Sequence, residues 1–317
     1  MPYPHPAPLG ASRLGQQALE VLYQHRLVST RQLHRLLTPT HANADYLRKQ
    51  LHRLRARDMV DRVGRRANGQ SELLWWVTDA GAAAIEAAGQ LSVRPYRMNE
   101  TAAFGPLQEH TLALNETGLC FVEWARRRDD ECHPLDWTPE LAHRLRDGET
   151  RPGDEAFLVP DSVLRYVHTG SGPGGQRRLL TFFVELDRAT MSVARLADKV
   201  RNYDRYRSYV PAPPPGLSGR KNPSGRPAWK DRYPAFPRLL IVLTGASEQR
   251  LQRRTDDLRS LVNADPKLAR SPLRAGVTSL QQLAKAGPFA PIFTPLLGAP
   301  TGLDAFLTPP AASTSAA

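Results

Sequence analysis

The sequence predicts a protein of two domains, in which an α+β domain with helices and a hairpin precedes an α/β domain. Three observations lead to this prediction. The length of 317 residues suits about two domains of roughly 150 residues each. Over residues 13–89, a hydrophobic period typical of helices gives way to a period of two. Over residues 107–298, apolar runs of strand length alternate with segments of helical pattern.

The remaining segments are predicted to be ends and connections. Residues 1–12 are rich in proline, and we expect them to be disordered. Residues 90–106 are predicted to be a linker. Residues 210–237 are predicted to form a Pro-rich loop within the second domain, because proline fits neither a helix interior nor a central strand. Residues 299–317 end in small polar residues and are predicted to be a disordered tail.

The composition is that of a globular protein with excess positive charge. Hydrophobic residues make up 41% and charged residues 23%, which excludes a fibrous or fully disordered chain. The net charge of +12 is unevenly spread. Residues 13–66 hold 12 cations against four acids, and residues 187–259 hold 16 against seven, whereas residues 100–186 hold nine against 15. Domains this basic typically bind a polyanion.

The sequence carries no signal for a membrane or an oxidising compartment. No apolar run approaches the ~18 residues of a membrane span, and the N-terminus lacks the charged and apolar regions of a secretory signal. Cys120 and Cys132 cannot form a disulfide framework, and Cys132 has no second ligand pair at zinc-site spacing. We therefore expect a cytoplasmic protein without a membrane partner.

The first domain is predicted to begin with three helices. Residues 13–26 carry an apolar stripe at helical spacing. Ser29 and Gln32 are spaced as a capping box for a second helix, which ends before Pro39. A third helix begins near Asn43. Its predicted inner face consists of Leu47, Leu51 and Leu54.

A hairpin and a fourth helix complete this domain. After residue 59 the hydrophobic period changes to two, and residues 60–66 and 71–77 flank Asn68-Gly69. This dipeptide supplies the positive φ angles that a tight hairpin needs. Thr78 then caps a helix that runs to residue 88. Three helices, a basic hairpin and a fourth helix predict a winged helix-turn-helix, in which the third helix enters the major groove of DNA.

The cations of this domain are the predicted DNA-binding residues. On the third helix they are Arg48, Lys49, His52, Arg53 and Arg55, and at the wing tip they are Arg65 and Arg66. Double-stranded DNA is therefore the expected partner. A winged helix that contacts protein instead would leave this face merely solvated, and the net charge of +8 over residues 13–66 argues against that alternative.

The second domain is predicted to run helix, strand, strand, helix, strand, helix. The predicted elements are a helix at 107–128, a strand at 157–167 that bends at Pro160-Asp161, a strand at 179–187, a helix at 191–209, a strand at 237–244 and a basic helix at 247–262. One further strand is expected among residues 130–150. In the first helix Glu109, Glu116 and Glu123 recur every seven residues, and we expect a solvated stripe.

The strand at 179–187 carries acids in an apolar surrounding. Alternation places Phe183, Glu185 and Asp187 on one face. An acid in so apolar a strand is costly unless it is paired or bound to a metal. Lys199 lies on the helix that must pack back on this strand. We therefore expect its ammonium within roughly 6 Å of the Glu185 or Asp161 carboxylate.

The bent hairpin with Pro160-Asp161, the strand with Glu185-x-Asp187 and the crossover helix resemble the PD-(D/E)XK nuclease superfamily, with its restriction-endonuclease-like fold. This resemblance implies that Asp161 and Glu185 bind a divalent cation, Mg²⁺ or Mn²⁺, and that a lysine beside them positions water. Asp187 stands where that lysine is expected. Either Lys199 takes its place, or Asp187 is a third metal ligand, so the candidate catalytic residues are Asp161, Glu185, Asp187 and Lys199.

A closer resemblance covers most of the chain. The winged helix, residues 110–115, Pro160-Asp161 and the pattern Glu185-x-Asp187-x-x-Thr190, followed by Lys199 and Tyr203, resemble the replication-relaxation family of plasmids and integrative elements. This resemblance implies a role in plasmid replication or DNA relaxation, with replication or conjugation proteins as further partners.

Missing motifs narrow the choice of function. The sequence has no His-x-His, which argues against a relaxase that binds its metal through a histidine pair, and no phosphate-binding Gly-x-x-x-x-Gly-Lys-Ser/Thr, which argues against an ATPase. Three functions stay open: a DNA-binding accessory protein of plasmid or mobile-element replication, an active Mg²⁺-dependent endonuclease, and a winged-helix transcriptional regulator whose second domain forms a homodimer.

Overall fold

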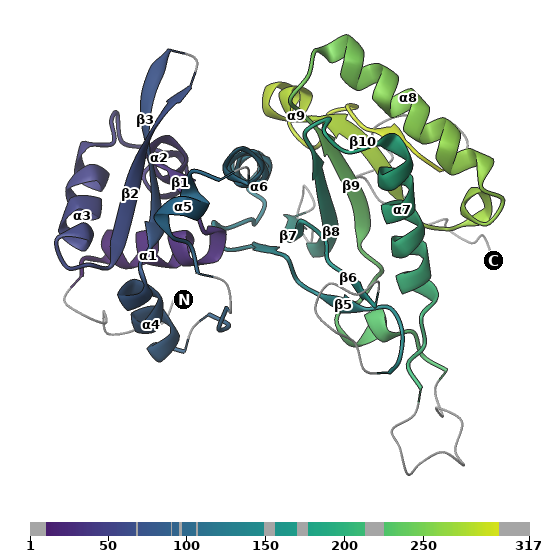
Figure 1. Cartoon of the computed structure of the whole chain (residues 1–317), viewed down its shortest axis with the longest axis horizontal. Helices are drawn as coiled ribbons and strands as arrows, with labels where there is room; N and C mark the ends of the chain where they lie inside the picture. Colours follow the sequence, from purple (N-terminus) through teal and green to yellow (C-terminus); the bar gives the residue numbers. More distant parts are fainter. Residues whose placement is uncertain are drawn as a thin grey trace. The chain divides into compact units, whose positions relative to one another are not determined.

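The computed structural model of the chain describes residues 11–67, 69–89, 91–94, 97–105, 107–148, 156–169, 177–212 and 225–297. Its contacts divide the chain into two compact units, residues 1–123 with 132–138 (unit 1) and residues 124–131 with 139–317 (unit 2). Both units combine helices with sheets, which confirms the predicted α+β and α/β class (Figure 1). Residues 1–10 of the predicted disordered N-terminus, residues 213–224 of the Pro-rich loop and the whole predicted tail lie outside the described residues. The described end of the loop contains a 3-10 helix at residues 228–231.

Unit 1 begins with the elements that the periodicity predicts. Its helices are α1 (Arg13–His25), α2 (Thr30–Leu37), α3 (Asp45–Arg55) and α4 (Asp79–Ala87), and its strands are β1 (Val28–Ser29), β2 (Val60–Ala67) and β3 (Gln70–Val77). The three strands form a sheet in the order β1-β3-β2. The Ser29–Gln32 capping box is present at the start of α2. The short strand β1 was not predicted, because two residues carry no periodicity.

The predicted linker 90–106 contains structure that belongs to unit 1. Within it lies α5 (Glu100–Ala103), and α6 (Gln108–Arg128) follows. Ala103 and Leu112 are buried in one apolar cluster with Leu27, Leu74 and Trp76. This packing draws the first turns of α6 into unit 1, so the contacts divide the chain after residue 123 rather than at the linker.

Unit 2 is built on a sheet with its crossover helices on one face. Five of its strands lie in the order β11-β10-β9-β8-β7. They are β7 (Ser162–Thr169), β8 (Arg177–Asp187), β9 (Arg238–Leu243), β10 (Ala275–Ser279) and β11 (Thr294–Pro295). The three strands β8, β9 and β10 are parallel, and β7 is antiparallel to β8. The parallel strands are connected by α7 (Val193–Ser208) and α8 (Glu248–Ala264), which cover the same face (Figure 1).

The smaller elements differ most from the predictions. They are β4 (Trp137–Pro139), in which the chain passes from unit 1 to unit 2, β5 (His143–Arg144), β6 (Phe157–Leu158), the 3-10 helices η2 (Ala228–Asp231) and η3 (Leu268–Arg270), and α9 (Leu280–Ala286). The predicted strand at 157–167 is interrupted rather than bent, since Pro160 has no N–H for a ladder. The segment β10-α9-β11 was not predicted.

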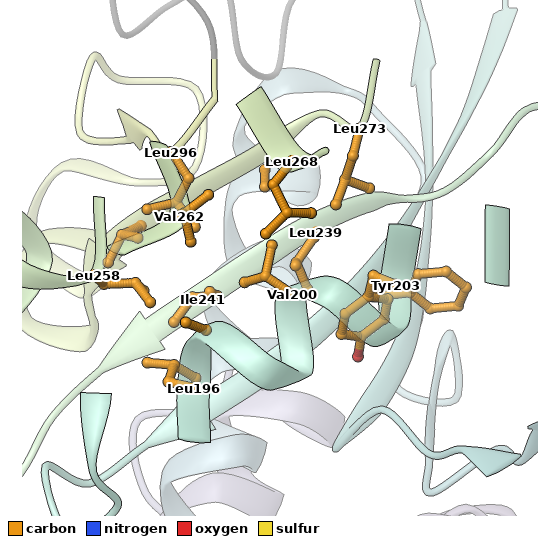
Figure 2. Close-up of a cluster of buried hydrophobic side chains, with 14 of the residues drawn as sticks. Leu196, Val200, Tyr203, Leu239, Ile241, Leu258, Val262, Leu268, Leu273 and Leu296 are labelled. Carbon is orange, nitrogen blue, oxygen red and sulfur yellow. The ribbon is translucent and has the colours of Figure 1, made fainter. Parts of the chain in front are cut away.

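The core of unit 2 lies between the parallel strands and the two crossover helices. Leu196 and Val200 of α7 and Leu258 and Val262 of α8 meet Ile241 of β9, and all five are buried (Figure 2). The register pairs Ile241 with Glu185 of β8, so both residues face the helices. The predicted alternation of β8 therefore places its acids on the covered face of the sheet.

One glycine of unit 2 tests a separate contact, between the end of α9 and Trp124 of α6. Gly287 follows α9 with a φ of +81°, and a Cβ atom there would overlap the Trp124 indole. We expect Gly287→Ala to lower the free energy of unfolding by roughly 2–4 kcal/mol, because overpacking and the left-handed conformation add. Urea unfolding measures this. The control is Gly64→Ala, where no atom lies within 4 Å of the new Cβ; equal stability of the two variants would contradict the packing described.

Candidate nucleic-acid interface and carboxylate site

The exposed face of α3 is the first candidate site. The inner face is as predicted, since Leu47, Leu51 and Leu54 are buried. The opposite faces carry the five cationic or histidine side chains predicted to bind DNA, and the structure exposes all of them. They are Arg48, Lys49, His52, Arg53 and Arg55.

The ion pairs of this face are weak. Arg48 Nη1 lies 2.7 Å from Asp45, and Arg55 Nε lies 2.8 Å from Asp61. All four side chains are about half exposed, and an exposed pair of this kind contributes about 0–1 kcal/mol. A phosphate group can therefore replace either carboxylate at little cost.

The two arginines predicted at the wing tip lie on β2 and have different surroundings. Arg66 is exposed. Arg65 is mostly buried, and its guanidinium donates to Glu109 of α6 at 2.7 Å and lies 4.0 Å from Glu72. The structure therefore places only Arg66 as a wing cation open to solvent, and Arg65 connects the wing to α6.

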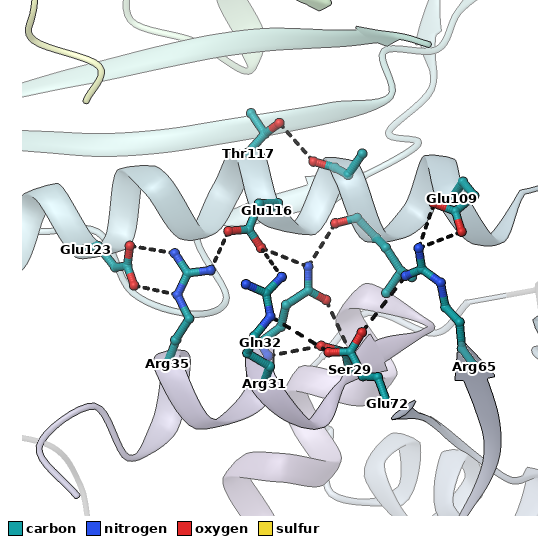
Figure 3. Close-up of polar contacts among 12 residues, drawn as sticks. Ser29, Arg31, Gln32, Arg35, Arg65, Glu72, Glu109, Glu116, Thr117 and Glu123 are labelled. Atoms are coloured by element: carbon teal, nitrogen blue, oxygen red, sulfur yellow. Dashed lines mark hydrogen bonds and ion pairs between the residues drawn. The ribbon is translucent and has the colours of Figure 1, made fainter. Parts of the chain in front are cut away.

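The acidic residues of α6 are not the solvated stripe that their spacing predicted. Figure 3 shows that Glu109 binds Arg65 and that Glu116 and Glu123 both bind Arg35 of α2. Arg35 donates two parallel hydrogen bonds of 2.8 Å to Glu123. Burial lowers the pKa of Arg35, but these carboxylates outweigh it and raise the pKa. The prediction was wrong because spacing alone does not show that arginines of α2 and the wing face this helix.

The second candidate site surrounds Glu185 in the middle of unit 2. The Glu185 side chain is 2% exposed. Its Oε1 accepts a hydrogen bond of 2.5 Å from the Tyr203 hydroxyl, and its Oε2 accepts one of 2.5 Å from Lys199 Nζ. The same ammonium lies 4.0 Å from Asp161 Oδ1. These distances confirm the expectation that Lys199 points to the two carboxylates.

Asp161 joins this site from the start of β7. Its Oδ2 accepts a hydrogen bond of 2.7 Å from the backbone N–H of Leu186. The interruption at Pro160 turns Asp161 out of the ladder and toward β8. Asp161 thus lies next to both Lys199 and the residue that follows Glu185.

Asp187 lies outside this group. It is almost fully buried, and its carboxylate binds Arg254 of α8 and accepts a hydrogen bond of 3.1 Å from the N–H of Ala189. Arg254 also donates to the carbonyl of Met191 at 2.5 Å. The two acids of β8 therefore bind different crossover helices, Glu185 binding α7 and Asp187 binding α8.

The arrangement does not fit the divalent-cation site expected from Asp161, Glu185 and Asp187. Within the described part of the chain, no group of three or more His, Cys, Asp or Glu side chains is placed to hold a metal. The Lys199 ammonium holds Glu185 and approaches Asp161, and Arg254 holds Asp187. The structure thus brings together Asp161, Glu185 and Lys199, with Tyr203 as a fourth member.

Burial dominates the electrostatics of this group. Burial, followed by the neighbouring charge of Asp161, raises the pKa of Glu185 to about 7, although Lys199 and Tyr203 act in the opposite direction. Burial lowers the pKa of Lys199, but the two carboxylates outweigh it and raise the pKa. Burial and the charge of Glu185 hold the pKa of Tyr203 well above its ordinary value. Tyr203 is therefore a neutral hydrogen-bond donor to Glu185.

Comparison with known families identifies the family of the chain. A family model described as replication-relaxation matches residues 19–218, most of the chain. The chain belongs to the replication-relaxation family. The predicted family is thus confirmed, and the matched range includes both the α3 face and the carboxylate site. No curated protein and no solved structure is significantly similar to the chain.

Membership in the replication-relaxation family indicates a role in plasmid or mobile-element replication or relaxation. Among the helices of the described segments, none is long and apolar enough to cross a membrane.

The buried carboxylate predicts a pH dependence of stability. The pKa of Glu185 is about 7 in the folded protein against an ordinary 4.5. Folding therefore favours the protonated form, and its contribution is full below pH 4.5 and is lost as the pH rises through about 7. At about 1.4 kcal/mol per pKa unit, the loss is on the order of 3 kcal/mol.

Glu185→Gln should remove this dependence, because the amide cannot titrate. We expect the free energy of unfolding of the variant, measured in urea between pH 4.5 and 7, to fall less with pH than that of the natural protein. The measured quantity is the change of the free energy of unfolding with pH rather than its absolute value, because the variant also loses the charge partner of Lys199 and is destabilised at every pH. Equal slopes would show that Glu185 titrates normally.

Proposed function

We propose that this replication-relaxation protein binds duplex DNA through α3 and the wing, and acts in the cytoplasm as an accessory protein of plasmid or mobile-element replication or relaxation. The observation that carries the proposal is the exposed cationic face of α3. The order of elements in unit 1, three helices followed by a hairpin, is that of a winged helix-turn-helix, whose third helix enters the major groove.

The pairing pattern of unit 1 supports α3 as the DNA-reading helix. Arg35 of α2 and Arg65 of the wing are bound by carboxylates of α6. The cations of α3 have only exposed partners, and Lys49 and Arg53 make no ion pair with another described residue. The paired arginines of α3 are 48–53% exposed, whereas Arg35 and Arg65 are only 20–26% exposed. DNA phosphates reach an exposed arginine and displace its carboxylate far more easily than they do for a covered one.

Arg65 then has a different role from the other predicted DNA-binding residues. Because α6 holds its guanidinium, we assign Arg65 as a positioning residue that orients the wing. Arg66 at the wing and Arg48, Lys49, His52, Arg53 and Arg55 on α3 are the proposed contacts with DNA.

Neutralising the α3 face tests the proposal. We expect the triple variant Arg48→Ala, Arg53→Ala and Arg55→Ala to bind duplex DNA more weakly and with a flatter salt dependence. Each lost phosphate contact removes roughly 0.9 from the slope of log affinity against log salt. Fluorescence anisotropy with labelled duplex at several salt concentrations measures both quantities.

A matched control separates contact from net charge. Arg250→Ala, Arg253→Ala and Arg270→Ala remove the same charge from exposed positions of α8 and η3. The proposal requires that this control retain the affinity and the slope of the natural protein. If the control loses binding and the α3 variant does not, the DNA surface is on unit 2.

A second candidate function is that of an endonuclease, and one observation favours it. Asp161, Glu185 and Lys199 come together as the resemblance to PD-(D/E)XK nucleases implies. A lysine beside two carboxylates can stabilise negative charge that develops on a phosphate. A bound divalent cation would supply Lewis-acid chemistry in such enzymes, but the carboxylates here are already engaged by Lys199 and Arg254.

Because Lys199 and Arg254 already bind these carboxylates, we expect supercoiled plasmid to stay intact when it is incubated with the purified protein and Mg²⁺ or Mn²⁺. Gel electrophoresis of nicked and linear products measures the outcome. Glu185→Ala, purified in parallel, controls for contaminating nucleases. Nicking by the natural protein that disappears in Glu185→Ala would establish the endonuclease instead.

A further inference from the structure

One end of unit 2 carries exposed cations that neither site above uses. Three segments meet there: β5, the last turn of α7, and η2. The Trp229 indole N–H of η2 donates to the carbonyl of Arg207 at 3.0 Å, and the N–H of Ala228 donates to that of Tyr209 at 2.9 Å. Arg232 donates to the carbonyl of Ala142, just before β5, at 2.9 Å. Figure 1 shows β5 and β6 beside the same end of α7.

Four exposed cations form what we call the η2 surface: Arg144, Arg226, Lys230 and Arg232. Its three arginines are oriented by neutral acceptors. Arg144 donates to the carbonyls of Arg146 and Gly148, Arg226 to that of Lys230, and Arg232 to that of Ala142. A backbone carbonyl fixes the direction of a guanidinium without cancelling its charge.

The described acids near the η2 surface are fewer than its cations. Asp231 is 71% exposed and lies 3.7 Å from Arg226. Asp147 accepts hydrogen bonds from the Tyr209 hydroxyl at 2.7 Å and from the N–H of Ala212 at 3.0 Å. Among the described residues, two carboxylates therefore lie beside four cations. The charge of Arg232 also reaches the buried His143. Burial and, second to it, this charge lower the pKa of His143 to about 4.

An aromatic side chain lies among these cations. Trp229 is partly exposed, and Lys230 Nζ lies 5.7 Å from the centroid of its ring. Phe236 packs edge-on against the indole at 5.5 Å between centroids. Guanidinium groups match phosphate geometry, and an indole offers a surface on which an unpaired base stacks. This combination fits nucleic acid better than an acidic peptide, which has no base to stack.

We propose that the η2 surface is a second contact with DNA, which holds the phosphate backbone outside the site of α3. The inference rests on the proposed function, because it extends the footprint of DNA that α3 already binds. DNA longer than the α3 site should therefore bind more tightly and release more counterions than a short duplex.

The test uses the full chain and the η2 variant Arg226→Gln, Lys230→Gln and Arg232→Gln. Glutamine keeps a side-chain donor and a similar stem, and a thermal melt verifies that the variant folds. Anisotropy is measured with labelled duplexes of increasing length, and with single strands, over a range of salt concentrations. We expect the variant to bind the shortest α3-binding duplex normally and to lose the gain in affinity with length.

The size of the effect follows from the contacts that are lost. The salt slope on long DNA should fall by roughly 0.9 per contact for a duplex, or roughly 0.7 for a single strand. The form of DNA, duplex or single strand, for which the variant loses more affinity is the form that the η2 surface binds. The control Arg250→Gln, Arg253→Gln and Lys267→Gln removes the same charges from exposed positions of unit 2 and should behave as the natural protein does.

Two results would overturn the inference. The first is that the η2 variant binds long DNA as the natural protein does, which would point to an acidic protein as partner. The second is that the η2 variant and the control lose equal affinity for long DNA. Failure of the proposed function is recognised separately. In that case the α3 variant would bind the short duplex normally, whatever the η2 variant does.

Discussion

The structure of unit 2 depends on the requirement that an ionisable group buried in an apolar sheet must have a partner. Glu185 and Asp187 lie on the covered face of β8, and each is 2–3% exposed. Lys199 and Tyr203 of α7 satisfy the first, and Arg254 of α8 satisfies the second. Removing one member of such a buried pair typically costs roughly 3–5 kcal/mol. The two acids therefore help to fix where both crossover helices pack.

The same requirement shapes unit 1, with the charges reversed. Arg35 and Arg65 are largely covered, and the glutamates of α6 satisfy them. This pairing explains why α6 belongs to unit 1 through residue 123 although the sequence suggested a linker before it. It also separates the cations that support the fold from those of α3 that are available to a partner.

These pairings bear on how the resemblance to nucleases is interpreted. Asp161, Glu185 and a lysine come together as that resemblance implies, yet Lys199 reaches them from a helix and Asp187 belongs to a different pair. Among the described residues, Lys199 pairs with Glu185 and approaches Asp161, and Arg254 pairs with Asp187. The cationic surfaces, by contrast, have exposed carboxylates or neutral carbonyls as partners, which is why we assign the interaction with DNA to them.

Local patterns in the sequence determined most of the elements. Helical spacing, the Ser29–Gln32 capping box and the Asn68-Gly69 sequence act over a few residues, so α1 to α4 and the strands β2 and β3 could be predicted closely. The alternation of β8 likewise placed Glu185 and Asp187 on one face. Short elements such as β1 and β10-α9-β11 carry too few residues for a period. Only the tertiary structure decided which partner each charge has, because a buried acid is satisfied equally well by a metal, a lysine or an arginine. The choice depends on which helix packs above it.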